Sequence, residues 1–131
     1  MLTQQDYCDY ETSRALAELG ISHCGMHFYE KGYGMTLHHN YMQYLNVRTA
    51  KALDRVLAIP LYSAQKWLRE KLNIIVEVFV DDDSDTPITY NIHKDGECVF
   101  HHHGRYFAVK DWNLALLEGI KEAVKILKNN G

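Results

Sequence analysis

The sequence predicts an α+β fold, with an antiparallel β-meander of three to four strands packed against a long C-terminal helix and a central helix, plus an N-terminal helix and hairpin. Strand patterns cluster late, at roughly residues 74 to 109, and helical patterns bracket them. Asp95-Gly96, between two alternating segments, is a strong signal for a two-residue hairpin turn. The segment that starts at Asp111, its expected cap, has the clearest apolar helical face in the chain.

The first part of the chain predicts a helix and then a hairpin. Thr3 and Asp6 have the spacing of a capping pair and Gly20 suits a left-handed C-cap, so we expect a helix over residues 4 to 19. The segments "MHFY" and "MTLHH" flank "EKGYG", a pattern typical of a hairpin or two short strands. Residues 49 to 58 fit either a short helix with Leu53 turned inward or an irregular excursion.

The central helix runs directly into the first strand of the meander. Pro60 disfavours a helical residue ahead of it, and Ser63 is a plausible N-cap for the helix that follows. The inner stripe of this helix is expected to comprise Ala64, Trp67, Leu68 and Leu72. The strand "NIIVEVFV" comes next, and "ITYNIH" alternates as a second strand.

Three consecutive histidines follow the Asp95-Gly96 hairpin. If His103-Gly104 forms a further tight turn, Phe100 lies opposite Phe107, and the histidine run is the end of a strand and the start of a turn. His101 and His103 could then share a face, but that face offers no third zinc ligand. We therefore expect no metal at the run.

Length, composition and charge limit the classes of protein to which the chain can belong. The 131 residues are the length of one ordinary domain, so we expect a single α+β domain over residues 1–131. The formal net charge of −3 gives no global attraction to phosphate backbones, which argues against nucleic acid as a partner. No uncharged apolar run approaches eighteen residues and the start has no signal-peptide pattern, so we expect no membrane partner and a cytoplasmic location. Cys8, Cys24 and Cys98, without a CxxC, favour buried reduced thiols.

A second histidine grouping is the candidate reactive centre. Cys24 and His27 could meet His38 or His39 if the flanking segments pair, and cysteine with histidine is a zinc-ligand combination. The set has no second spaced pair. His93 opposite Cys98 resembles half of a nucleophile and base pair, but no orienting third residue accompanies it. We therefore expect no catalytic, cofactor-binding or metal-binding residues, and no cofactor.

The most basic part of the chain offers another alternative. It could serve a nucleic-acid-binding accessory protein through stacking tyrosines and a group of cations, namely Arg48, Lys51, Arg55, Lys66 and Arg69. Charges on the outer face of an amphipathic helix are usually only solvated.

Three stretches carry a family resemblance: "SRALAELGISHCGMHFY", "IPLYSAQKWLREKLNIIVEV" and "LALLEGIKEAVKIL". Together they resemble a group of small uncharacterised proteins from prophage and mobile-element regions of gut anaerobic bacteria. The most specific matches are Trp67 to Lys71 and Gly119 to Ala123. The resemblance implies a fold and a phage-related context, and it supplies no catalytic residue.

The function expected from these observations is a non-catalytic binding or accessory protein, related to phage or mobile elements, that acts through protein contacts, with a homodimer as one arrangement. Aromatic residues of "GMHFYEKGYGM" and "NYMQY" are the expected contact surface. The first alternative is a small metal-binding protein or enzyme that uses Cys24, His27, His38 or His39. The second is the nucleic-acid-binding accessory protein.

Overall fold

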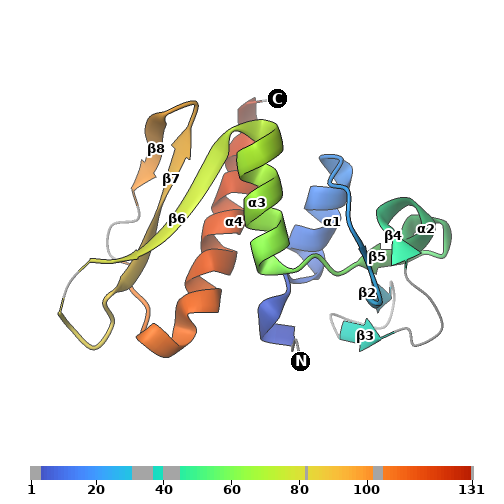
Figure 1. Ribbon diagram of the computed structural model, residues 1–131, viewed down its shortest axis with the longest axis horizontal. Helices are drawn as coiled ribbons and strands as arrows, with labels where there is room; N and C mark the ends of the chain where they lie inside the picture. Colours follow the sequence, from blue (N-terminus) through green and yellow to red (C-terminus); the bar gives the residue numbers. More distant parts are fainter. Residues whose placement is uncertain (1–3, 31–36, 40–44, 82, 102–104, 131) are drawn as a thin grey trace. The chain divides into compact units, whose positions relative to one another are not determined.

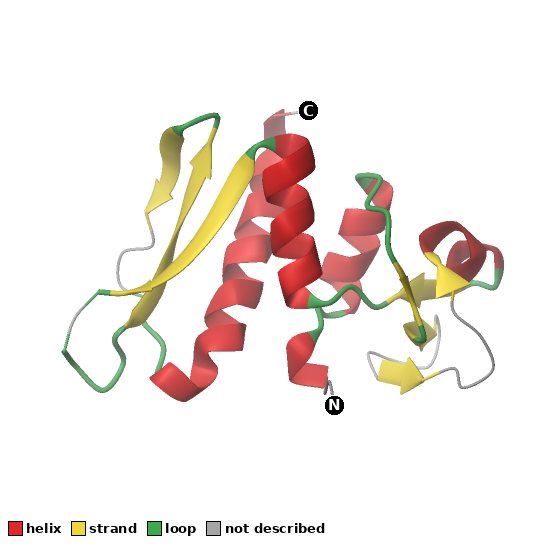
Figure 2. Ribbon diagram, in the orientation of Figure 1, coloured by secondary structure: helices red, strands yellow, loops and turns green. Residues whose placement is uncertain are grey.

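The computed structural model describes residues 4–30, 37–39, 45–81, 83–101 and 105–130. Helices and antiparallel sheets make up these residues, which confirms the α+β class (Figures 1 and 2). The chain divides into two compact units, residues 1–60 and 61–131. The single domain expected from the length stays a prediction.

In the N-terminal unit, the first helix is shorter than expected. A 3₁₀ turn (Gln4–Asp6) precedes α1 (Tyr10–Glu18), so the expected helix over residues 4 to 19 is wrong at its start. The reason is a long-range pairing, because Tyr7 forms an antiparallel bridge with Pro60 and the Cys8 amide bonds to the Ile59 carbonyl. Extended backbone there excludes helix, and Thr3, the expected cap, lies outside the described residues.

Asp9 caps α1 instead, since its side chain accepts a hydrogen bond of 2.9 Å from the Thr12 amide. The helix ends as expected at Gly20, whose φ of +97° is in the left-handed region. The amide of Gly20 bonds to Ala17 and that of Ile21 to Leu16, and both Leu16 and Ile21 are buried. This is a Schellman ending with its hydrophobic contact.

Short strands and one short helix complete the N-terminal unit. Strand β2 (His27–Glu30) lies between β3 (Leu37–His39) and β5 (Arg55–Leu57), all antiparallel, and the β2–β3 pairing confirms the expected hairpin. Strand β1 (Cys24–Gly25) pairs with β4 (Leu45–Asn46). Residues 49 to 58 contain the end of α2 (Val47–Ala52) and then β5. Leu53, expected inside, is 47% exposed because it ends α2 rather than lying within it.

In the C-terminal unit, α3 (Leu61–Leu72) begins two residues before the expected cap Ser63. Proline restricts the residue before it and not those after it, so the helix starts directly after Pro60. This start places the buried Leu61 on the same face as Ala64 and Leu68, which are buried as predicted.

The sheet of this unit has three antiparallel strands in the order β6 (Ile74–Val80), β7 (Ile88–Lys94) and β8 (Glu97–His101). Asp95 and Gly96 have φ of 52° and 87°, as the predicted turn requires. Helix α4 (Trp112–Asn130), which follows a 3₁₀ turn (Val109–Asp111), lies with α3 against one face of the sheet (Figure 2).

Gly119 lets α4 approach the sheet closely. A methyl group added there would lie 2.5 Å from Cγ1 of Val76 and 3.3 Å from the Tyr90 ring. No side chain fits that space without displacing its neighbours.

The predicted pairing of Phe100 with Phe107 is wrong. Phe107 pairs with Ile88 through two backbone hydrogen bonds of 3.0 and 2.8 Å, and not with Phe100. Phe100 instead pairs with Ile92 of β7. The chain after β8 therefore returns to the same strand β7 further along, and the turn residues His103 and Gly104 lie outside the described residues.

Candidate functional site

The N-terminal unit contains a hollow of about 780 Å³. Its walls come from the second half of α1, the loop that follows, α2 and β5. The residues that line it include Arg14, Glu18, Ile21, His23, Cys24, Val47, Arg48, Lys51, Asp54, Arg55 and Val56. Sites for small ligands usually enclose about 300 to 1,000 Å³, so this hollow has the size of a ligand site.

One helix ending and two long-range strand pairings assemble these walls. The left-handed Gly20 ends α1 and turns the chain into the loop of residues 21 to 24. The pairing of Cys24 with Asn46 sets the end of that loop beside the start of α2, which Asn46 caps by accepting from the Thr49 amide at 2.7 Å. Antiparallel pairing with β2 then fixes Arg55 and Val56 of β5.

Two of the cations on the walls already have carboxylate partners. Arg14 forms an ion pair with Glu18 one turn along α1, with Nε to Oε1 at 3.4 Å. Arg55 pairs with Glu30 across β5 and β2, also at 3.4 Å, and its guanidinium lies 4.3 Å from the centre of the Phe28 ring. The contacts of Arg55 hold it against β2, whereas the Arg14–Glu18 pair lies exposed on the surface of α1 and balances the charge of Arg14 without fixing its position.

Two further cations line the hollow from α2. Arg48 and Lys51 are three residues apart and therefore share a face of the helix. Both are exposed, and neither forms an ion pair within the part of the chain that the structure describes. Asp54, which follows α2 with a φ of 60°, contributes a carboxylate to the same lining.

His23 lines the hollow from the loop and is half-buried. Burial lowers the pKa of its imidazole, because the charged form loses hydration there. His23 is consequently neutral at pH 7 and contributes a polar but uncharged ring to the wall.

Among the described side chains, those of the alternative metal-binding set do not converge. Cys24 is exposed on the hollow, whereas His27 Nδ1 shares a 3.0 Å hydrogen bond with the Tyr7 hydroxyl. His38 stacks on Phe28, the residue next to His27, and successive strand residues point to opposite faces. Within the described ranges, no three His, Cys, Asp or Glu side chains are placed to hold a metal ion.

His39 pairs with His27 in the β2–β3 register, and its side chain lies outside the description. The Nε2 atom of His38 is buried with no hydrogen-bond partner among the described residues. In the histidine run, His101 ends β8 and is exposed, while His102 and His103 lie outside the described residues.

The cysteines differ from the expectation of three buried thiols. Only Cys8 is buried, and burial together with the neighbouring Asp9 carboxylate raises the pKa of its thiol, which keeps it protonated. Cys24 and Cys98 are exposed free thiols. The predicted pairing of Cys98 with His93 is confirmed, but the Cys98 thiol donates to the Phe100 carbonyl at 3.7 Å. The prediction that Cys98 is buried was wrong because β8 lies at an edge of its sheet.

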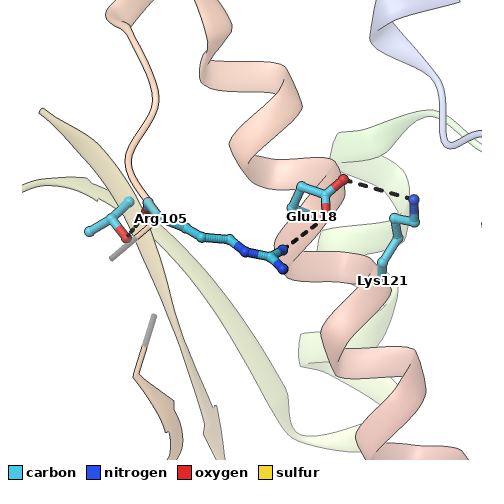
Figure 3. Close-up of polar contacts among 4 residues, drawn as sticks. Arg105, Glu118 and Lys121 are labelled. Atoms are coloured by element: carbon cyan, nitrogen blue, oxygen red, sulfur yellow. Dashed lines mark hydrogen bonds and ion pairs between the residues drawn. The ribbon is translucent and has the colours of Figure 1, made fainter. Parts of the chain in front are cut away.

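In the C-terminal unit, a cluster of polar side chains links neighbouring elements of the fold (Figure 3). Arg105, which follows the histidine run, lies 3.9 Å from Glu118 of α4, and Glu118 lies 3.8 Å from Lys121. The Thr89 hydroxyl of β7 donates to the Arg105 carbonyl at 3.1 Å. Through Arg105, the cluster links the segment after the histidine run to both β7 and α4.

The structure gathers part of the predicted basic set. Arg48, Lys51 and Arg55 line the hollow, whereas Lys66 and Arg69 are exposed on α3 in the C-terminal unit. Of the expected aromatic contact surface, residues 31–36 and 40–44 lie outside the described residues.

Sequence reasoning missed Arg14, Ile21 and His23 as lining residues. The available signal was Gly20, because a left-handed helix ending turns the chain back and creates a concave edge beside the last helical turn.

Comparison of the chain with protein-family models, curated proteins and solved structures finds no match. Among the described helices, none combines the length and hydropathy that a membrane span requires.

Proposed function

We propose that the chain is a non-catalytic binding protein whose ligand occupies the hollow of the N-terminal unit. The observation that carries this proposal is the combination of volume and lining. Apolar side chains of Ile21, Val47 and Val56 lie together with the cations of α2 in a space of about 780 Å³. A concave, largely apolar surface with a few polar groups is the usual form of a small-molecule site.

A phage-related or mobile-element setting for this binding protein is part of the proposal, and it is supported only by what the family resemblance implies. Contacts with a protein partner or a second copy of the chain belong to the same proposal. Nothing in this role requires a nucleophile, and the buried Cys8 thiol is held in its unreactive form.

The test uses a neutral apolar dye, N-phenyl-1-naphthylamine, whose fluorescence rises in an apolar environment. We expect saturable binding to a single class of site on the whole chain. The variant Val47→Glu should abolish it, because Val47 lines the hollow and is half-buried. A carboxylate in the first turn of a helix is favourable, so α2 should remain folded.

Val80→Glu is the matched control, since Val80 is 64% exposed at the end of β6 in the other unit. It should bind the dye as the unmodified chain does, and circular dichroism should show that both variants are folded. Failure of the dye to bind, or equal binding by folded Val47→Glu, would contradict the proposal.

A further inference from the structure

The charges of the hollow identify the chemistry of its ligand, and this step rests on the proposed function. Arg14 and Arg55 are neutralised by Glu18 and Glu30. Arg48 and Lys51 remain as two adjacent positive charges with no ion pair among the described residues. An occupant of the hollow is therefore in a position to supply the missing negative charge.

We propose that this occupant is a phosphate monoester on an apolar or aromatic body of about the size of a nucleoside. A phosphate monoester carries a charge of about −1.5 to −2 at pH 7, and its three terminal oxygens allow it to contact both cations at once. Arginine grips two phosphate oxygens with its planar fork, and lysine adds a compact point charge.

The remaining lining fits the body of such a ligand. The half-buried Val47 and Val56 offer apolar surface on which a ring can lie. The carboxylate of Asp54 can accept hydrogen bonds from hydroxyl or amino groups and would repel a second anionic group. One phosphate at one end of an otherwise neutral, hydroxyl-bearing molecule satisfies both features.

Two sources could supply this chemistry, a free nucleoside monophosphate or the 5′-terminal phosphate of a nucleic-acid strand. The experiment measures displacement of the neutral dye from the whole chain by four nucleoside 5′-monophosphates, their nucleosides and inorganic phosphate at low ionic strength. At least one monophosphate should bind about tenfold or more tightly than its nucleoside. A 5′-phosphorylated oligonucleotide that competes better than its 5′-hydroxyl form would identify the strand end as the source.

Arg48→Gln/Lys51→Gln should weaken binding of the monophosphate at least about tenfold, measured relative to that variant's own affinity for the dye. Lys66→Gln/Arg69→Gln is the matched control, because it removes two exposed cations at the same helical spacing from α3. Equal weakening by both pairs, or no preference for monophosphate over nucleoside, would overturn the inference. Dye binding that Val47→Glu abolishes would still uphold the binding site itself, so the two proposals can fail separately.

Discussion

The two units differ in how the buried N–H and C=O groups of their backbones find hydrogen-bond partners. In the C-terminal unit, strands β6 and β7 pair along their whole length of seven residues. The buried backbone groups there bond to the backbone of the neighbouring strand. In the N-terminal unit no described strand is longer than four residues, and polar side chains are buried with the apolar ones. Short strands leave backbone groups that something else must satisfy.

Ser13 and Tyr29 do this in the N-terminal unit. The buried Ser13 hydroxyl donates to the Cys8 carbonyl at 3.3 Å and accepts from the Ile59 amide at 3.2 Å. The Tyr29 hydroxyl donates to the same Cys8 carbonyl at 2.7 Å. Side-chain hydroxyls thus make hydrogen bonds here that a longer sheet would make through its backbone.

Truncation of the C-terminal core should have the largest effect on stability. Ile92 is fully buried in the central strand β7, so Ile92→Ala should lower the free energy of unfolding by about 2–5 kcal/mol. Ile75→Ala is the matched control, because Ile75 is 40% exposed in the neighbouring strand, and it should cost far less. Urea unfolding followed by tryptophan fluorescence measures both, since Trp67 and Trp112 lie in this unit. Similar costs for the two isoleucines would show that the sheet does not form the core described here.

Overpacking the contact between helix and sheet is expected to have the next largest effect. Gly119→Val should cost towards the upper end of about 1–3 kcal/mol, since even one added carbon lies 2.5 Å from Val76. The same tryptophan signal measures it. Val76→Ala should relieve part of the clash, so the double variant should cost less than the sum of the single changes. Strict additivity would mean that α4 does not approach β6 this closely.

Ser13→Ala tests the side-chain hydrogen bonds of the N-terminal unit. It leaves the buried Ile59 amide without its partner and should cost about 1–2 kcal/mol. Tyr29→Phe should cost less, about 0.5–1.5 kcal/mol, because Ser13 still donates to the Cys8 carbonyl. Tyrosine fluorescence and far-ultraviolet circular dichroism follow the unfolding of both variants. The reverse ranking would show that Tyr29 and not Ser13 holds this backbone.

Ser13→Ala also tests whether the chain unfolds as the single domain predicted from its length. If Ser13→Ala shifts the tryptophan transition as much as the circular dichroism transition, the two units unfold together. If the tryptophan signal is unaffected, the units unfold separately, and the prediction of one domain is wrong.

The contrast between the units also explains what the sequence could predict. The faces of α3 and α4 follow a regular period, and Asp95-Gly96 fixes the pairs of β7 and β8 next to the turn, so these features were predictable from local patterns. The register shift between Ile92 and His93 was not. The pairing of Phe107 with Ile88 was not, because it depends on the path taken by the intervening segment. Periodicity describes elements long enough to repeat.

In the N-terminal unit, long-range pairing decided between local alternatives. Thr3 and Asp9 are both capable helix caps, and the bridge between Tyr7 and Pro60 selects Asp9. The hollow was not predictable for a similar reason, since its walls come from four short segments. Arg14 has the i,i+4 spacing to Glu18 of an ordinary solvated pair, and only the fold places it beside α2.

The smallest expected effect is a pH dependence that belongs to the N-terminal unit. The folded state lowers the pKa of His23 through burial, so the unfolded chain binds the proton more tightly. Stability should therefore be constant with respect to this group well above about pH 6.5, and it should decrease as the pH falls below that value. His23→Gln removes the titration, and the difference between the unmodified chain and this variant, measured by urea unfolding at several pH values, isolates the contribution of His23. A difference that does not change below pH 7, or that favours the unmodified chain on acidification, would mean that the wall of the hollow does not bury this ring.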